Sequence, residues 1–217
     1  ELVERLKSYK RGVLAAIFRR KIRFKDRSGN EFPEWKKVRF SELYTQVSEK
    51  NDGSFGTDKI ISVANMYFKS DVTIGSNDYL RSYNICRLGD ITFEGNKSKN
   101  FSFGRLVENY IGDGIVSHVF IVFRPINKEH NIDYWKIAIN YEPVMGRILS
   151  KCTKKSTMMT DLVAKDFLQQ SILVPCYEEQ KKIADFVSKL DMEIEHSDLA
   201  LEQLSAHRQE LLRQLFI

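Results

Sequence analysis

Two stretches in the middle of the chain combine basic side chains with amides and hydroxyls, a chemistry suited to contacting nucleic acid. They are residues 94–105 (EGNKSKNFSFGR) and residues 143–160 (PVMGRILSKCTKKSTMMT). Lys and Arg neutralise phosphates, while Asn, Arg, Ser and Thr can reach base edges. Lysine-rich loops are also common as plain solvated surface, so composition alone leaves both interpretations open. The candidate contact residues are Asn96, Lys97, Lys99, Asn100, Arg105, Arg147, Lys151, Lys154, Lys155 and Thr157.

Catalytic chemistry has little support in this sequence. There is no Pro-Pro pair of the kind an amino-methyltransferase needs to hold its target amine, and no Gly-rich loop after a strand for a nucleotide or S-adenosylmethionine. Asp26 with residues 34–36 (EWK) matches a nuclease metal site only superficially. His196 and His207 are too far apart along one helix to share a metal ion. We therefore expect no catalytic residue, no metal site and no cofactor.

Composition indicates a folded intracellular protein. A hydrophobic content of 42% in 217 residues is ample for a core, and no apolar run reaches the ~20 residues that a membrane helix needs. The three cysteines, Cys86, Cys152 and Cys176, have no CxxC spacing, which favours reduced thiols in a cytosolic (cytoplasmic) protein. We expect no membrane association.

Charge is distributed unevenly along the chain. Residues 1–25 hold nine basic and two acidic side chains, whereas residues 178–217 hold nine acidic and five basic ones. The net charges are +7 and −4, so the two ends could attract one another, within this chain or between neighbours.

The C-terminal segment has the pattern of a coiled-coil helix. Steps of four and three residues connect ten positions, eight of them apolar, over more than four heptads. About 38 residues at 1.5 Å each would extend about 57 Å, so this seam must pack against another helix. The two polar positions, Ser197 and Arg208, either fix register or partner choice or lie where the partner helix has ended. The apolar seam residues are Ile183, Val187, Leu190, Ile194, Leu201, Leu204, Leu211 and Leu215.

The start of the chain repeats its end. Residues 6–18 (LKSYKRGVLAAIF) align with residues 204–216 (LSAHRQELLRQLF), so that Leu6 coincides with Leu204 and Phe18 with Phe216. We expect helices 1–19 and 178–217 to pack antiparallel, with Leu6, Val13 and Ile17 facing the seam. Any part of the seam that stays exposed would allow two chains to form a homodimer.

Between the helices, short apolar runs separated by Gly, Asn and Asp predict an α/β (α+β) globular domain of six or seven strands. Residues 119–123 (VFIVF) are expected to form a buried strand. A helix is expected over residues 134–149, with boundaries made uncertain by Pro143. Trp35 is expected to anchor the packing.

Three motifs resemble type I restriction-modification specificity subunits. The most specific is SILVPCYEEQKKIADFVSKLDMEIE (171–195), a strand ending in Pro followed by Glu-Gln, KIA and LD. FKDRSGNEFPEWKKVRFSEL (24–43) is similar to the entry into a second target recognition domain, and YNICRLGDITFEGNKSKNFSFG (83–104) to the family's GD strand and polar loop.

The resemblance implies an organisation for the whole chain. In that family two recognition domains are separated by two long conserved helices. Residues 1–19 would then be the tail of the central helix, 20–177 one target recognition domain and 178–217 the distal helix. The chain would then be the C-terminal half of such a subunit: either a fragment beginning inside the central helix, which the uncapped start favours, or a natural half-subunit that dimerises.

The resemblance also implies a function. The chain would be a non-catalytic subunit that recognises one half of a bipartite site in double-stranded DNA and docks methyltransferase (M) and restriction (R) subunits. Both cationic loops become expected DNA contacts, with Phe101 and Phe103 pinning the first loop rather than wedging into DNA. The alternative is a structural coiled-coil adaptor whose globular domain binds protein, and the two acid-poor loops favour DNA.

Overall fold

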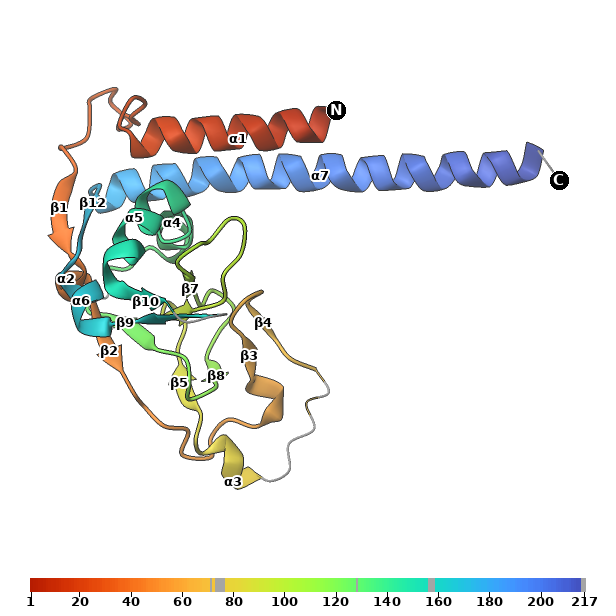
Figure 1. Ribbon diagram of the computed structural model, residues 1–217. Coiled ribbons are helices and arrows are strands. Elements are labelled where there is room, and N and C mark those ends of the chain that lie inside the picture. The colour runs from red at the N-terminus through yellow and green to blue at the C-terminus, as the bar shows by residue number, and fades with distance from the viewer. Residues whose placement is uncertain (71, 73–76, 128, 156–158, 216–217) are drawn as a thin grey trace. The chain divides into compact units, whose positions relative to one another are not determined.

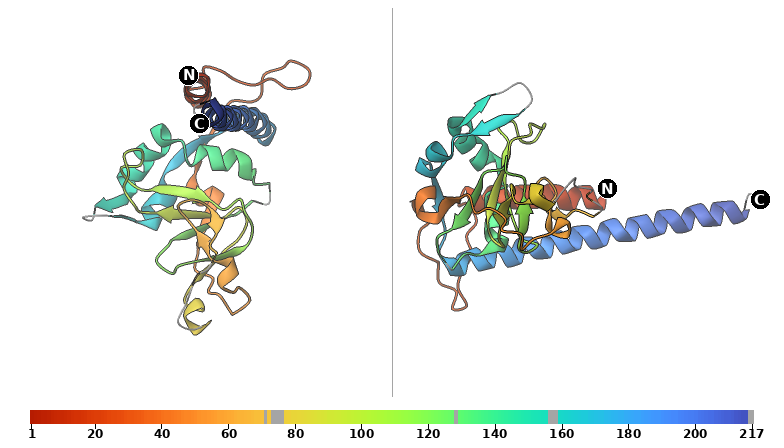
Figure 2. Two further views of the ribbon diagram at one scale, coloured as in Figure 1. Left: turned by 90° about the vertical axis from the view of Figure 1, so that its right-hand side faces the viewer. Right: turned by 90° about the horizontal axis from the view of Figure 1, so that it is seen from below.

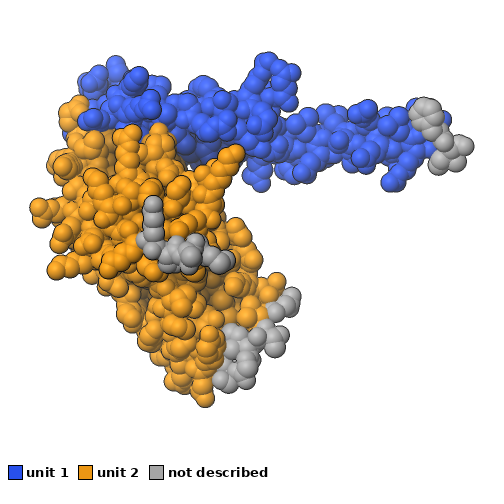
Figure 3. All heavy atoms as spheres, viewed as in Figure 1, with its two compact units in different colours: residues 1–33, 176–217 blue, residues 34–175 orange. Residues whose placement is uncertain are grey.

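The computed structural model describes residues 1–70, 72, 77–127, 129–155 and 159–215 (Figure 1). The chain divides into two compact units (Figure 3). A helical unit contains residues 1–33 and 176–217, and a globular unit contains residues 34–175.

Two antiparallel helices form the helical unit. Helix α1 (Leu2–Phe18) lies beside the first half of α7 (Tyr177–Leu215), and the rest of α7 extends past it (Figure 1); Figure 2 shows the pair from two further directions. Lys7 pairs with Asp198 at 3.2 Å, and Lys10 pairs with Asp191. The predicted antiparallel packing is confirmed, and these ion pairs join the basic start to the acidic end.

The seam of α7 changes from buried to exposed along its length. Ile183 and Val187 are buried, Leu190, Ile194 and Ser197 are half-buried, and the seam leucines from Leu201 onward are exposed. On α1, Val13 and Ile17 are buried and Leu6 is half-buried. Arg208 lies in the exposed part of α7. The apolar positions of this part are Leu201, Leu204, Leu211 and Leu215, exposed by 48%, 66%, 44% and 75%.

A buried ion pair fastens the segment after α1 to the start of α7. Arg23 donates to the Glu179 carboxylate at 3.0 and 3.3 Å, and also to the carbonyl oxygens of Phe32 and Pro33. The Glu179 side chain is only 1% exposed. Glu179, the glutamate of the Glu-Gln motif, is therefore a structural residue that holds residues 20–33 against α7.

Asp26 stabilises a turn. Its carboxylate accepts the backbone N–H groups of Ser28 and Asn30, both at 2.8 Å, and the hydrogen bonds from Asn30 lower its pKa. Gly29 supplies the positive φ of 84° that the turn requires. The carboxylate thus serves the local turn signalled by the sequence DRSGN.

The globular unit is built from short strands and helices. Its main sheet has four antiparallel strands in the order β2-β9-β6-β7, and four further pairs are β1–β12, β3–β4, β5–β8 and β10–β11. The strands are β1 Lys36–Arg39, β2 Tyr44–Val47, β3 Ile61–Ser62, β4 Tyr67–Phe68, β5 Asn84–Cys86, β6 Ile91–Glu94, β7 Arg105–Glu108, β8 Gly114–Val116, β9 Val122–Pro125, β10 Thr153–Lys155, β11 Thr160–Leu162 and β12 Ser171–Val174. The helices are α2 Phe40–Leu43, α3 Asn77–Leu80, α4 Ile132–Ala138, α5 Glu142–Cys152 and α6 Ala164–Gln169, with a 3-10 turn, η1, at Thr57–Lys59.

The α+β class with a short first and a long last helix is confirmed, whereas the predicted strand count is wrong. Twelve strands of two to four residues appear among the described residues, because polar turns interrupt the apolar runs more often than expected. The expected strand at 119–123 begins only at Val122. Phe120 N–H bonds to the Ser117 carbonyl in a turn, and Val119 is 67% exposed.

The single helix expected over 134–149 is two helices. Asn131 caps α4 by accepting the N–H of Tyr134 at 2.9 Å, and Pro143 lies in the first turn of α5. Pro lacks an N–H, which costs nothing in a first turn but breaks a helix interior. The chain therefore starts a new helix at this proline.

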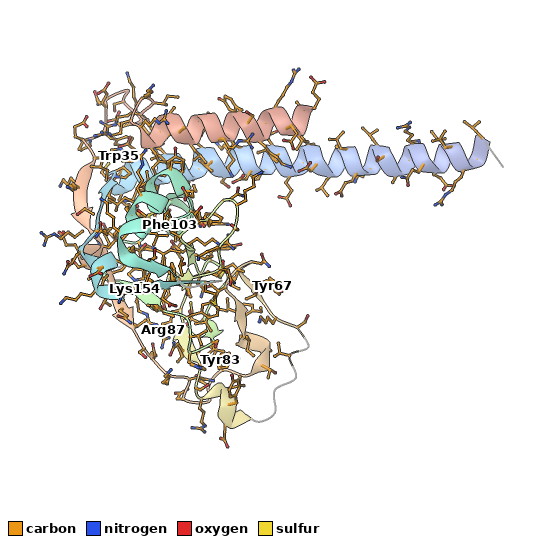
Figure 4. The ribbon with its side chains drawn as sticks, in the orientation of Figure 1. Trp35, Tyr67, Tyr83, Arg87, Phe103 and Lys154 are labelled. Atoms are coloured by element: carbon orange, nitrogen blue, oxygen red, sulfur yellow. The ribbon has the colours of Figure 1, made fainter. Side chains whose placement is uncertain are left out.

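Aromatic rings fill the centre of the globular unit. The ring centres of Phe40 and Phe167 are 4.4 Å apart, and those of Phe123 and Phe167 are 5.0 Å apart. Trp35, labelled in Figure 4, is buried, as expected of an anchor.

A buried acid–imidazole pair lies beside this core. His130 Nε2 is 2.7 Å from Glu108 Oε1, and Glu108 is fully buried. Desolvation raises the pKa of Glu108 well above its usual range, with nearby Asp133 and Asp90 adding to the shift and Lys136 opposing it. Burial lowers the pKa of His130 to about 4. Both shifts favour the uncharged forms of the two side chains that share this hydrogen bond.

We expect Glu108→Gln to remove one component of the pH dependence of stability. Because the folded state keeps a proton that the unfolded chain releases above pH 4.5, this group favours the folded state less and less as pH rises. The free energy of unfolding of the unmodified chain should therefore fall relative to that of the variant as the pH rises above about 4.5. Urea unfolding at several pH values measures the difference, and two parallel curves would contradict the assignment.

Candidate nucleic-acid interface

The two cationic stretches predicted from the sequence lie side by side in the globular unit. The β6–β7 loop, residues 95–104, meets the β10–β11 hairpin through a bridge between Asn96 and Met159. The Thr160 N–H and hydroxyl both donate to the Gly95 carbonyl, at 2.9 and 3.1 Å. A Cβ at position 95 would lie 2.3 Å from the Thr160 carbonyl oxygen, so this close approach requires glycine. Segments more than 50 residues apart thus form one surface.

The β6–β7 loop and the β10–β11 hairpin, called the two tips below, expose polar and basic side chains among their described residues. In the β6–β7 loop a tight turn, with Phe101 N–H donating to the Ser98 carbonyl at 3.2 Å, leaves Lys97, Lys99 and Asn100 exposed. Lys154, labelled in Figure 4, is exposed on β10. Lys155 follows it on β10, and Thr157 lies outside the described residues.

Two further candidates lie on α5. Arg147 and Lys151 are exposed one helical turn apart, while the opposite side of the helix buries Ile148 and Leu149. Spacing of four residues places the two cations on one face of the helix. Basic side chains of residues 143–160 are therefore exposed on α5 as well as on β10.

Arg105 is engaged inside the domain. Its Nε donates to Glu94 Oε2 at 3.0 Å, its Nη2 donates to the Ala64 carbonyl, and its guanidinium lies 5.1 Å from the centre of the Phe101 ring. Asn96 donates its amide to Glu94 Oε1 at 2.7 Å. Because the Glu94 side chain is only 7% exposed, one buried carboxylate holds both ends of the β6–β7 loop.

The phenylalanines of this loop are half-buried. Phe101 faces a small pocket together with Met145 and Leu149 of α5. Phe103, labelled in Figure 4, is also half-buried. Partial burial of both rings agrees with the expectation that they hold the β6–β7 loop in place.

A second arginine network lies elsewhere in the globular unit. Arg124 pairs with the buried Asp90 at 2.9 Å and with Glu49 at 2.7 Å, and Arg87 pairs with the same Glu49. The largest influence on the raised pKa of Arg124 is its hydrogen bond with Asp90. These arginines are neutralised by carboxylates within the globular unit.

Sequence reasoning missed one neighbour of this surface, the turn between β3 and β4, whose Ala64 carbonyl accepts the bond from Arg105. Over the part of the chain that the structure describes, no helix could span a membrane, and no three His, Cys, Asp or Glu side chains gather as a metal site.

The sequence profile of the type I restriction modification DNA specificity domain matches residues 34–203. The chain belongs to this family. The resemblance inferred from the motifs is thereby confirmed, and the matched range includes both tips and the first part of α7. No curated protein matches the chain.

Solved structures share the fold of this specificity domain. The HsdS subunit from Thermoanaerobacter tengcongensis has 15% identity and a TM-score of 0.56, covering 91% of this chain and 46% of its own. The type I restriction-modification S subunit from M. genitalium has 16% identity and a TM-score of 0.55, covering 100% and 55%. A structure from work on complex assembly and conformational transition of the type I R-M system has 15% identity and a TM-score of 0.59, covering 99% and 50%. The chain spans about half the length of these proteins.

Proposed function

We propose that the globular unit recognises one half of a bipartite DNA target for a type I restriction-modification enzyme, through the surface formed by the β6–β7 loop and the β10–β11 hairpin. The observation that carries this proposal is the Gly95–Thr160 junction, which brings two acid-poor tips together. The exposed lysines Lys97, Lys99 and Lys154 suit phosphates, and the exposed amide of Asn100 suits a base edge.

We further propose that the chain is a non-catalytic subunit in the cytoplasm. Methyltransferase (M) and restriction (R) subunits would supply the chemistry that uses S-adenosylmethionine, ATP and metal ions, and would dock on the specificity subunit. The acidic and basic side chains around Glu49 and around Glu94 form ion pairs within the fold. This structural role supports the proposal that the subunit is non-catalytic.

The test is duplex binding by the chain together with its methyltransferase partner at two salt concentrations. Phosphate contacts release counterions, so affinity should fall steeply as salt rises. Methylation profiling of a host that carries the complete system would identify the target. A complex that shows no salt-sensitive binding to any duplex would exclude DNA recognition and favour the protein-binding adaptor.

We also propose that a second copy of the chain can pair through the exposed part of α7. Leu204 and Leu211 lie on the seam, where a partner helix would bury them. Changing both to Lys should abolish self-association at high micromolar concentration and alter stability by less than about 0.5 kcal/mol, because both are already exposed.

Sedimentation velocity measures this self-association. A matched control is Leu199→Lys with Leu212→Lys, two leucines of α7 that are exposed but lie off the seam. An unmodified chain that sediments as a monomer at these concentrations, or an equal effect of both double variants, would refute pairing through the seam.

A further inference from the structure

The turn between β3 and β4 is tied to the base of the β6–β7 loop. Arg105, the first residue of β7 after this loop, donates through Nη2 to the Ala64 carbonyl of the turn. The same guanidinium donates through Nε to the buried Glu94, which also accepts from Asn96. One carboxylate–guanidinium pair thus fixes the turn relative to the loop.

The backbone of the turn has an uncommon conformation. Met66 has a φ of 49°, in the left-handed region that a non-glycine residue occupies at a cost of about 1–3 kcal/mol. Its N–H donates to the Ser62 carbonyl at 2.7 Å, and its side chain is buried in a cluster with Val116 and Val122. Burial of Met66 offsets the backbone cost and locks the turn.

This arrangement directs the residues on either side of Met66 outward. Asn65 is exposed, and Tyr67, labelled in Figure 4, is 50% exposed. An amide and a phenol ring are therefore both exposed on one turn. A turn whose backbone is already fixed loses little conformational entropy when it binds, which suits its side chains to specific contacts.

The stretch around the turn lacks acidic residues, like the β6–β7 loop. Residues 59–70 (KIISVANMYFKS) contain two lysines, Lys59 and Lys69, and no acidic residue. Lys59 lies 4.7 Å from the centre of the Phe68 ring, and Lys69 is exposed. Two isolated lysines do not form a cationic run, so composition alone does not mark this stretch.

We propose that the β3–β4 turn is a third contact of the specificity domain with its target DNA, in which Asn65 and Tyr67 touch the bases. Glu94 and Arg105 are positioning residues that keep the turn in register with the β6–β7 loop. This inference rests on the proposed function of the loop. Asn pairs its amide with the N6 and N7 edge of adenine, and the Tyr ring offers an apolar face and a hydroxyl to the neighbouring base.

The test uses the specificity subunit assembled with the methyltransferase of its own system and a duplex that carries the target found by methylation profiling. Asn65→Ala and Tyr67→Ala should each weaken binding to the target about tenfold and leave binding to a non-target duplex unchanged within about twofold. The matched control is Tyr79→Ala. Tyr79 is also 50% exposed but lies on α3, and its loss should change neither affinity.

The outcomes separate this inference from the proposed function. If Lys97→Ala with Lys99→Ala weakens binding while Asn65→Ala and Tyr67→Ala do not, the turn is no contact, and the loop keeps its function. If the lysine variants also bind normally, the proposed function fails and this inference fails with it.

The positioning role has its own readout. In an Arg105→Met background, Tyr67→Ala should weaken target binding much less than about tenfold, because the turn has already lost its register. Lys at position 105 can still donate to Glu94. In an Arg105→Lys background, Tyr67→Ala should therefore weaken target binding more than it does in the Arg105→Met background. Fully additive losses, with circular dichroism showing that both variants are folded, would overturn the role of Arg105.

Discussion

Changing Lys97 and Lys99 to Glu is expected to lower the affinity of the assembled specificity subunit for duplex DNA between tenfold and a hundredfold at moderate salt. Both side chains are exposed at the tip of the β6–β7 loop. Charge reversal replaces two phosphate attractions by two repulsions, and neither change disturbs the hydrogen bonds made by Glu94. The measurement is a titration of labelled duplex at several salt concentrations.

The neutral version of this experiment tests the mechanism. Lys97→Ala with Lys99→Ala should lower the slope of log affinity against log salt by about 2, one unit for each phosphate that the loop no longer neutralises. The control is Lys36→Ala with Lys37→Ala, two exposed lysines on β1 of the same unit. Equal slopes for the variant and the unmodified chain would show that the β6–β7 loop touches no phosphate.

Replacing Arg23 by Met is expected to destabilise the chain by about 3–5 kcal/mol. Arg23 holds a nearly fully buried Glu179 with two hydrogen bonds, and removing the guanidinium leaves that carboxylate without its opposite charge. Its bonds to the carbonyls of Phe32 and Pro33 are lost as well. Urea unfolding followed by circular dichroism measures the change.

Two controls show whether burial is the cause. Lys7→Met removes an ion pair with Asp198 whose side chains are 41% and 46% exposed, and solvent screening should limit its cost to less than about 1 kcal/mol. Arg23→Met with Glu179→Leu removes both buried charges and should recover much of the stability lost in the single variant. Equal costs for the Arg23 and Lys7 variants would show that burial adds nothing to the Arg23 pair.

The two helices of the helical unit could be predicted from apolar patterns that repeat over many residues. The seam from Ile183 onward and the repeat of residues 6–18 are apolar regularities over many turns, and such regularities determine helix type and pairing. The buried pair of Arg23 and Glu179 lay outside this reasoning, because it joins residues 156 positions apart and no periodicity marks it.

The globular unit was predicted less completely, for a different physical reason. Strands of two to four residues are too short to show a reliable alternation of apolar and polar residues. The apolar run VFIVF therefore predicts one strand, although a turn at Ser117 leaves Val119 exposed. Composition did find the two cationic tips. It could not show that Arg105 is engaged by Glu94 and Ala64, because residue type alone does not reveal a side chain's partners.

The junction of the two tips has a consequence for how such a domain can diversify. The two hydrogen bonds described above run from the Thr160 N–H and hydroxyl to the main-chain carbonyl of Gly95, and these two bonds do not use the side chains of Lys97, Lys99 and Asn100. Evolution can therefore exchange those three side chains without dismantling the joint that presents them. Such a domain can keep its backbone structure while its exposed side chains change. New target preferences can then arise through a few substitutions in the β6–β7 loop.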